Sequence, residues 1–485
     1  MSRIITLISE SVHIYDNLIF ETVFVIIHIN ECEEVMLKRK AYRQLLRWKE
    51  ESRGSSSLLV EGARRVGKTT LVSEFGKNEY RSFLIIDFTN VSAEIKELFE
   101  TKRENLDSFF LYLSVYYDIK FFERDTLIVF DEVQAFPLAR GFLKHLVADG
   151  RYDYIATGSL ISIKRNIKDI LIPSEEESFT LNPLNFEEFL DARGKQALAQ
   201  LLGSALVNLE PLPDALHRQA MELFREYMLI GGMPQAIVKY LETSDFTAVD
   251  REKRKILDLY RKDIMRYAEG YEGKVISIFD EIPSQLSKQE KRFTLASLEK
   301  DARMRSYKDA FFWLSDAMLV NLCHNATDPS VGLRLSREHT TFKCYMADTG
   351  LLVTQAFKTK SFTPQQLYRA ILFDNLGINE GMLMENVVAQ SLCASGHQLY
   401  FYSRNNRRDG AGPIEIDFLV IGHQGSGIKI NPIEVKSGRR YRTNSLDRFE
   451  KKFSERLGNA YILHAGNIEA EGRRIRLPLY LTGWL

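Results

Sequence analysis

The chain has 485 residues, of which 45% are hydrophobic and 27% are charged, with 65 basic and 65 acidic side chains. This composition predicts a globular protein of two to four domains that can bury a large core. A net charge of zero excludes a global basic field for nucleic acid, so any nucleic-acid surface has to be a local patch.

Cysteine and histidine usage argues against a metal site built from these residues. The nine histidines show no metal-ligand spacing, and the four cysteines form no Cys-x-x-Cys pair: Cys32, Cys323, Cys344 and Cys393. Scattered cysteines are typical of reduced thiols. We therefore expect a cytoplasmic protein without a zinc site.

Residues 1–35 include a mostly apolar stretch, Ile19 to Asn30, that carries Glu21 and is too short to span a bilayer. Neither the basic start nor the cleavage site of a signal peptide is clear. Met36 looks like a natural start before a basic amphipathic helix, Ala41 to Trp48. We expect residues 1–35 to be an upstream translation extension or a poorly integrated arm. A membrane anchor is the less favoured alternative, and no membrane partner is expected.

The stretch from Leu58 to Val72 carries the most specific motif of the chain. Apolar strand residues lead into Gly-x-x-x-x-Gly-Lys-Thr, the spacing of a phosphate-binding loop, and a helix start comes directly after it. Its glycines let several N–H groups point at one anion. Lys68 brings a catalytic cation to the β and γ phosphates, and Thr69 offers a hydroxyl to Mg²⁺. The predicted nucleotide contacts are Gly62, Ala63, Arg64, Arg65, Val66, Gly67, Lys68, Thr69 and Thr70.

A continuous apolar strand from Thr126 to Gln134 runs into two carboxylates, Asp131 and Glu132. Such runs are typical of strands that are covered on both faces in a parallel sheet. Asp131 is suited to hold Mg²⁺ through a bound water molecule, which is the role of the Walker B aspartate. Glu132 can orient or deprotonate the attacking water. The alternative is that the two carboxylates merely cap the next helix, which is less favoured after a phosphate-binding loop.

A further strand, Tyr152 to Ser159, ends in polar residues. Ser159 at this end is predicted to sense the γ-phosphate as part of the catalytic set, and a plain turn is the alternative. Strands that alternate with helices imply a doubly wound α/β sheet whose ligand lies at the carboxyl ends of the strands.

The order of these motifs resembles the AAA+ division of P-loop ATPases. More closely, GARRVGKTTL, LIVFDEVQ, TGS and FTLNPLNFEEFL resemble a bacterial and archaeal family of AAA-type ATP-binding proteins with a fused C-terminal domain of uncharacterised function. The resemblance runs from about Met36 to the C-terminus. It implies binding and hydrolysis of ATP with Mg²⁺, and a ring or dimer as the assembly, but it supplies no substrate.

The middle of the chain is expected to be mostly helical from residue 191 to residue 270. Gly231 to Pro234 is interpreted as a turn that matches a Gly-Gly-x-Pro element of the family. A helix at Leu295 to Ala302, a second at Tyr307 to Ala317 and a strand at Met318 to Cys323 form a winged-helix pattern. Its exposed charges are modest for DNA, so packing or dimerisation is an equal alternative.

The C-terminal part contains a second constellation. Asp417 lies in the strand Ile414 to Ile421, and a Gly-rich hairpin leads to Glu434 and Lys436, which share one face of the next strand. This D…E-x-K pattern resembles the signature of the PD-(D/E)xK nuclease fold, although Ile416 replaces the proline. The resemblance implies that Asp417 and Glu434 hold Mg²⁺ and that Lys436 acts on the attacking water, with Glu385 completing the site.

The stretch from Arg404 to Arg442 contains eight basic and four acidic residues. This local excess of positive charge suits binding to a phosphate backbone. A solvated charged face is the plain alternative. DNA is therefore a candidate partner of the C-terminal region, and a salt-bridged, inactive nuclease-like fold is the alternative to cleavage.

The predicted architecture is α/β throughout. It comprises an extension (1–35), a P-loop parallel-sheet ATPase domain (36–200), a helical lid with a winged-helix-like domain (201–345) and a restriction-endonuclease-like α/β domain (346–485). The predicted function is ATP hydrolysis coupled to DNA binding or to Mg²⁺-dependent DNA cleavage. Two alternatives stay open: a nucleotide-controlled switch, and a defence- or toxin-type interaction protein with an inactive nuclease-like domain.

Overall fold

The computed structural model describes residues 37–158, 175–288, 292–357, 365–366, 368–369, 380–404, 413–424, 427–438 and 440–485. The predicted extension 1–35 and the predicted sensor Ser159 lie outside these residues. None of the helices in the described part of the chain has the long apolar stretch that crossing a bilayer requires.

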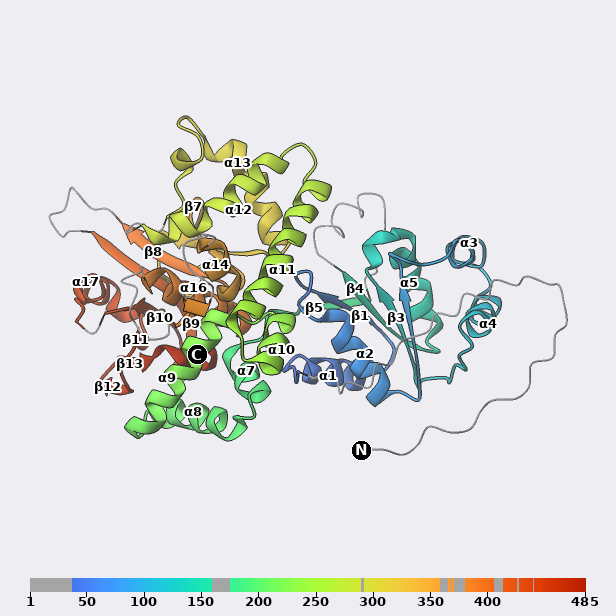
Figure 1. Ribbon diagram of the computed structural model, residues 1–485, viewed down its shortest axis with the longest axis horizontal. Helices are drawn as coiled ribbons and strands as arrows, with labels where there is room; N and C mark the ends of the chain where they lie inside the picture. Colours follow the sequence, from blue (N-terminus) through green and yellow to red (C-terminus); the bar gives the residue numbers. More distant parts are fainter. Residues whose placement is uncertain are drawn as a thin grey trace. The chain divides into compact units, whose positions relative to one another are not determined.

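The first part of the chain is built on a parallel sheet with the strand order β2-β3-β4-β1-β5 among the described strands (Figure 1). The strands are β1 (Ser57–Glu61), β2 (Ser82–Asp87), β3 (Thr126–Asp131), β4 (Asp153–Gly158) and β5 (Glu176–Thr180). In a parallel sheet the carboxyl ends of all strands meet at one edge. The residues that come after β1, β3 and β4 are therefore brought together there.

Alternate side chains of these strands enter two different cores, as the buried apolar runs predict. Leu58 and Val60 of β1 pack with α1 and α2, whereas Leu59 packs with α3, α4 and α5 on the other face. The sheet is therefore covered on both faces, which confirms the predicted doubly wound arrangement. The helices are α1 (Tyr42–Ser52), α2 (Lys68–Glu79), α3 (Ala93–Thr101), α4 (Leu106–Tyr117) and α5 (Pro137–Asp149), with the short turn η1 (Val133–Ala135) after β3.

A helical segment comes next in the chain, as predicted for residues 191–270. It comprises α7 (Phe186–Ala192), α8 (Gln196–Asn208), α9 (Asp214–Ile230), α10 (Pro234–Thr243), α11 (Phe246–Tyr267) and α12 (Glu272–Ser287). Gly231 and Gly232 separate α9 from α10. A Cβ on Gly232 would collide with the carbonyl oxygen of Leu184, so only glycine permits this close approach.

The winged-helix prediction is wrong in its first helix. Residues Leu295–Ser297 form only the 3-10 turn η2, and α13 (Met304–Asp316) comes after it. The next strand, β6 (Val320–Ala326), pairs antiparallel with β7 (Arg337–Met346) and parallel with β8 (Tyr400–Arg404). The predicted wing is thus part of a larger sheet, because its pairing partner β8 comes much later in the chain.

This second sheet is mixed, with the order β12-β13-β11-β10-β9-β8-β6-β7 in the described part. The predicted hairpin is present as β9 (Ile414–Gln424) and β10 (Gly427–Val435), and the further strands are β11 (Ala460–His464), β12 (Glu469–Glu471) and β13 (Arg474–Pro478). The associated helices and turns are α14 (Thr349–Ala356), α16 (Glu380–Ala394), α17 (Asn444–Phe453), η3 (Ser454–Arg456) and η4 (Leu479–Trp484). One large core joins α7–α14 and α16 to this sheet, and the predicted boundary at 345/346 falls at the end of β7.

Candidate nucleotide-binding site

The loop between β1 and α2 has the backbone of an anion-binding turn. Gly67 adopts φ +96° immediately before α2 begins at Lys68, a conformation that glycine reaches without strain. The N-terminal end of α2 therefore opens onto the loop, and its unpaired N–H groups and dipole favour a negative ligand.

Lys68 is buried at the start of α2, with 5% of its surface exposed. Its ammonium donates to the carbonyl oxygens of Gly62 (3.0 Å) and Ala63 (3.2 Å). Burial lowers the pKa of Lys68, while the nearby charges of Glu132 and Asp131 act in the opposite direction. A phosphate group that engages Lys68 would add an anionic acceptor, which pairs with the ammonium more strongly than the two neutral carbonyl oxygens do.

Asp131 ends β3 and faces the loop. The hydroxyl of Thr69 lies 3.0 Å from both of its carboxylate oxygens, and the hydroxyl of Thr157 also donates to it. Burial raises the pKa of Asp131, and the two hydroxyl donors oppose this rise. A hydroxyl beside a carboxylate at the mouth of a phosphate-binding loop is a donor set that fits Mg²⁺.

Glu132 comes directly after Asp131 and has φ +51°, an unusual conformation for a residue with a Cβ. Its N–H donates to the hydroxyl of Thr157 (3.2 Å), and its carboxylate accepts from the Gln134 amide. The turn thus directs two consecutive carboxylates to different partners at one strand end. This separation suits the two roles predicted for Asp131 and Glu132.

These groups share a cavity of about 850 Å³. The predicted contact residues that line it are Arg64, Arg65, Gly67, Lys68, Thr69, Thr70, Asp131 and Glu132. Gly62, Ala63 and Val66 contribute instead through their carbonyl oxygens, which accept from Lys68 or Arg39.

The cavity also has a wall that the sequence did not indicate. Tyr260, Asp263 and Arg266 of α11 and Trp313 of α13 line it. Asp263 pairs with Arg64 at 2.7 Å, and the Tyr260 hydroxyl donates to the carbonyl oxygen of Arg64 at 3.0 Å. The phosphate-binding loop is therefore in direct contact with the helical segment of the chain.

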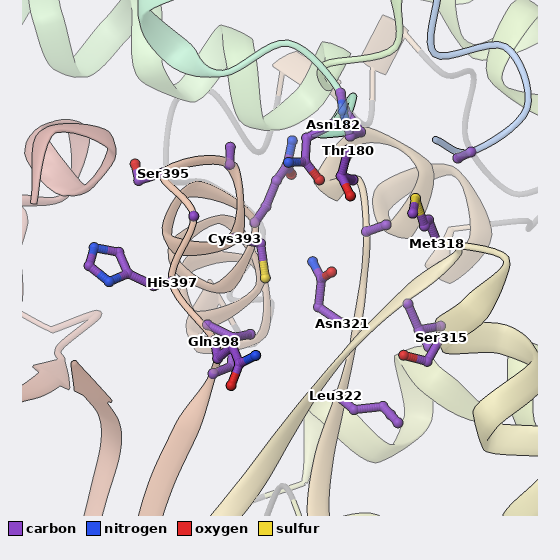
Figure 2. Close-up of a pocket in the computed structure, with 18 of the residues that line it drawn as sticks. Thr180, Asn182, Ser315, Met318, Asn321, Leu322, Cys393, Ser395, His397 and Gln398 are labelled. Carbon is purple, nitrogen blue, oxygen red and sulfur yellow. The ribbon is translucent and has the colours of Figure 1, made fainter. Parts of the chain in front are cut away.

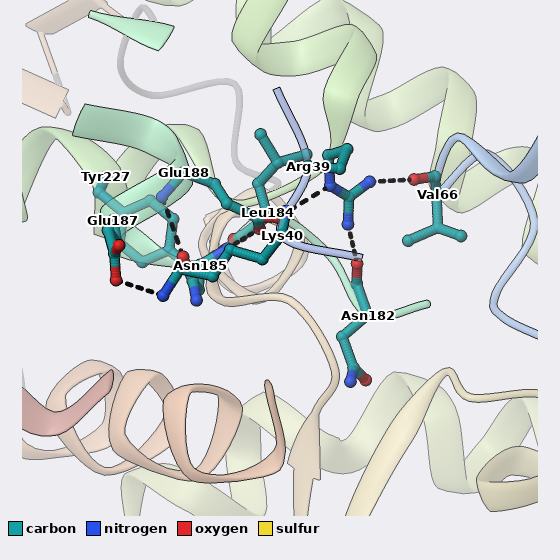
Figure 3. Close-up of polar contacts among 9 residues, drawn as sticks. All are labelled: Arg39, Lys40, Val66, Asn182, Leu184, Asn185, Glu187, Glu188 and Tyr227. Atoms are coloured by element: carbon teal, nitrogen blue, oxygen red, sulfur yellow. Dashed lines mark hydrogen bonds and ion pairs between the residues drawn. The ribbon is translucent and has the colours of Figure 1, made fainter. Parts of the chain in front are cut away.

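Arg39 holds the other side of the loop (Figure 3). Its guanidinium donates to the carbonyl oxygens of Val66 (2.9 Å) and Asn182 (2.6 Å) and to Glu188 (3.2 Å). Glu188 closes a capping box with Asn185 at the start of α7. No sequence motif pointed to Arg39, because its partners lie 27 to 149 residues away.

Two of the three predicted C-terminal carboxylates, Glu385 and Asp417, lie around the ammonium of Lys343 together with Glu415, whereas Glu434 does not. The ammonium of Lys343 lies 3.4 Å from Asp417, 3.4 Å from Glu415 and 3.9 Å from Glu385. Burial by itself would lower the pKa of Lys343, but the three carboxylates outweigh it and raise the pKa. Lys343 is 1% exposed, so its charge is balanced almost entirely by these groups.

Glu434 lies on β10 beside Asp417 of β9 in the antiparallel register, and its carboxylate pairs with Lys436 at 2.6 Å. Burial raises the pKa of Glu434 to about 6. Among the described residues, no group of three or more His, Cys, Asp or Glu is placed to hold a metal ion. Glu385 and Asp417 do not fit a divalent ion in this arrangement, because the Lys343 ammonium lies within 3.9 Å of both.

Three segments of the chain match models of known protein families. Residues 55–190 match a family model described as "AAA domain". Residues 221–361 and 380–481 match models described as "Domain of unknown function (DUF8612)" and "Domain of unknown function (DUF4143)". No curated protein matches the chain.

Solved structures give only weak similarity. The Orc1 protein of Aeropyrum pernix in complex with DNA is 11% identical, with a TM-score of 0.26, over 68% of this chain and 95% of that chain. AMPPCP-bound DnaA from Aquifex aeolicus is 13% identical, with a TM-score of 0.27, over 58% and 87%. Drosophila ORC bound to DNA is 14% identical, with a TM-score of 0.24, over 67% and 98%. We draw nothing from similarities at this level.

The family match and the geometry together define the first part of the chain. A parallel sheet, a phosphate-binding loop before α2 and an acidic strand end lie within the matched residues 55–190. Residues 55–190 therefore match an AAA domain in both sequence and fold, and such a domain implies nucleotide binding.

Proposed function

We propose that the protein binds ATP with Mg²⁺ in the cavity at the phosphate-binding loop and hydrolyses it. The observation that carries this proposal is the 3.0 Å approach of the Thr69 hydroxyl to both oxygens of Asp131, next to Lys68. Thr69 and Asp131 would hold Mg²⁺, which supplies charge compensation for the phosphates. Lys68 binds the β and γ phosphates, and Glu132 orients the attacking water and takes its proton.

We further propose that nucleotide state is passed to the rest of the chain through α11. Arg64 of the loop is bonded to α11 by its side chain and by its carbonyl oxygen. A phosphate competes for the Lys68 ammonium with the carbonyl oxygens of Gly62 and Ala63, which directly precede Arg64. A shift of the loop would therefore strain or break the Arg64 contacts. This is the physical basis for a nucleotide-controlled switch.

For the C-terminal region two functions compete. One is Mg²⁺-dependent DNA cleavage by Glu385, Asp417, Glu434 and Lys436. The other is a nuclease-like domain that binds DNA or another partner without cutting. The buried Lys343 favours the second, because its ammonium already neutralises the carboxylates that a metal ion would need. We accordingly propose an ATP-driven switch with a non-cleaving C-terminal domain, with DNA as its candidate partner.

One preparation of the full chain tests both parts. Phosphate release from ATP should depend on Lys68, so Lys68→Ala should lose ATP binding and turnover. Linear and circular DNA, with Mg²⁺ or Mn²⁺, should remain uncut by the wild-type chain. Neither ion should raise the melting temperature of the Lys68→Ala variant, because this variant binds no nucleotide that would bring Mg²⁺ to Thr69 and Asp131.

The opposite results point to the competing function. Cleavage that is lost in Asp417→Ala while ATP hydrolysis continues would establish the nuclease. A metal-dependent rise in melting temperature that Asp417→Ala abolishes would show that an ion displaces the Lys343 ammonium. An ion that binds only the folded state stabilises it and raises the melting temperature. Wild-type ATP turnover in Lys68→Ala would remove the ATPase proposal itself.

A further inference from the structure

A second cavity, of about 860 Å³, shares no lining residue with the nucleotide cavity. It is lined by the end of β5, the C-terminal part of α13, the start of β6 and the end of α16. Figure 2 shows Thr180, Asn182, Asn321 and Cys393 directed toward one another from these segments. The motif stretch Phe179 to Leu190 contributes Thr180 and Asn182 to this cavity, but none of the roles proposed above uses it.

The lining is basic and contains no carboxylate among its described residues. Arg334, Arg337 and Lys40 belong to it, whereas Asp and Glu side chains do not. Lys40 is paired with Glu187, so its charge is partly compensated. Within the described residues, Arg334 and Arg337 have no carboxylate partner. The cavity therefore carries an uncompensated positive charge, and an anion is the ligand that this charge favours.

Arg337 is held in the cavity wall by His324. Its Nη2 lies 2.7 Å from Nε2 of the His324 ring, which is 7% exposed. Burial, together with the Arg337 charge, lowers the pKa of His324 to about 4, so the ring is neutral at pH 7 and accepts this hydrogen bond. The Nε of Arg337 is buried without a partner in the described residues. A buried guanidinium N–H without an acceptor is unfavourable, and an oxyanion is a strong acceptor for it.

The remaining polar groups suit a nucleotide unit. No described residue bonds to the side chains of Thr180, Asn182 or Asn321, so their hydroxyl and amide groups can donate and accept. Burial raises the pKa of Cys393 to about 12, so its thiol adds no negative charge. A volume of about 860 Å³ is within the range of small-molecule sites.

We propose that this cavity binds the phosphate group of a nucleotide or of a nucleic-acid strand. Arg334 and Arg337 take the phosphate, and Asn182 and Asn321 contact the rest of the nucleotide unit. This site goes beyond the proposed ATPase function and does not depend on hydrolysis. It adjoins the phosphate-binding loop, because Ala63 of the loop lines the cavity and Arg39 donates to the carbonyl oxygens of both Asn182 and Val66.

The test uses the full chain carrying Lys68→Ala, so that the phosphate-binding loop does not take up the probe. The anisotropy of a fluorescein-labelled single-stranded oligothymidylate with a 5′-phosphate reports binding, and AMP and inorganic phosphate serve as competitors. Arg334→Glu should weaken binding on the order of tenfold or more, because it replaces a charge-assisted contact by repulsion. Arg334 is exposed, so this variant should keep the parent melting temperature.

Two further variants sharpen the result. Arg337→Lys keeps the charge but loses the planar fork, so it should bind more weakly than the parent and more tightly than Arg334→Glu. Lys77→Glu reverses an exposed charge at the end of α2, far in sequence from the cavity, and should leave binding unchanged.

The competitors identify the source of the phosphate. Competition by AMP indicates a soluble nucleotide, whereas binding of the oligonucleotide without such competition indicates a strand. The proposal is overturned if no probe binds, if Arg334→Glu binds like its parent, or if Lys77→Glu weakens binding as much as Arg334→Glu.

Discussion

Asp131 and Glu132 are neighbours in the chain, yet their surroundings differ. Asp131 is buried and accepts from the Thr69 and Thr157 hydroxyls, while Glu132 is partly exposed beside the cavity. The positive φ of Glu132 produces this difference. Strained backbone of this kind is common at functional sites, because surrounding contacts hold it in place.

Glu132→Gln should retain ATP binding and lower turnover by about 10² or more, because it removes the proton acceptor but leaves the Mg²⁺ ligands Thr69 and Asp131. Fluorescent-nucleotide titration and phosphate release measure the two quantities separately. Lys68→Ala is the companion variant and should fail at the binding step. Wild-type turnover in Glu132→Gln would show that another group activates the water.

The raised pKa of Glu434 has a consequence for stability. The pKa of Glu434 is about 6 in the folded protein and 4.5 in the unfolded chain. Between these two pH values the folded state therefore binds a proton that the unfolded state has lost. The free energy of unfolding should therefore fall as pH rises through this window, by about 2 kcal/mol in total. Glu434→Gln should remove this fall in urea unfolding between pH 4.5 and 6.5, whereas Glu455→Gln, at an exposed position, should keep it. If the free energy of unfolding of Glu434→Gln falls with pH as in the wild type, another group is responsible for the titration.

At the scale of elements, a single charged side chain, that of Arg39, connects two segments that are far apart in the sequence. Arg39 lies before α1 and connects the phosphate-binding loop to the start of α7. Arg39 and Glu188 are each 7% exposed in their side chains, so this is a buried ion pair with its hydrogen bonds satisfied. Losing one partner of such a pair costs more than the pair contributes, because the other charge stays buried.

Arg39→Ala should lower the free energy of unfolding by about 3–5 kcal/mol and weaken ATP binding, because Glu188 and the Val66 carbonyl lose their donor. Arg43→Ala, at an exposed position of α1, is the matched control and should stay within about 0.5 kcal/mol of the wild type. Urea unfolding and nucleotide titration measure both effects. Equal stability of the two variants would remove the assigned role of Arg39.

At the scale of the whole molecule, the AAA-like domain is in contact with the helical segment that begins at α7. Its loop contacts α11 through Arg64, and its segment after β5 contacts the α9–α10 turn, where the Leu184 N–H donates to the Gly232 carbonyl oxygen at 2.8 Å. The motif residues Asn182 to Glu188 thus connect the two sides. This explains why a stretch outside the nucleotide cavity carries part of the family resemblance.

The start of the folded unit that carries the phosphate-binding loop can be tested by truncation. A chain that begins at Met36 should bind ATP like the full chain, because it keeps Arg39 and every described residue. A chain that begins at Tyr42 lacks Arg39 and Lys40 and should bind ATP more weakly and unfold at a lower temperature. Loss of ATP binding in the Met36 chain would show that residues 1–35 belong to the fold.

The phosphate-binding loop, the acidic strand end and the β9–β10 hairpin could be predicted from sequence because each is local: its spacing and apolar pattern lie within one short stretch. The winged helix was predicted from equally local signals. It failed because Leu295–Ser297 forms only a 3-10 turn and because β6 pairs with the distant strand β8, His324 with Tyr400. Lys343 reaches Asp417 across 74 residues, and Arg39 reaches Glu188 across 149. Only the tertiary structure decides such contacts, because packing of distant segments, rather than local backbone preference, brings the charges together.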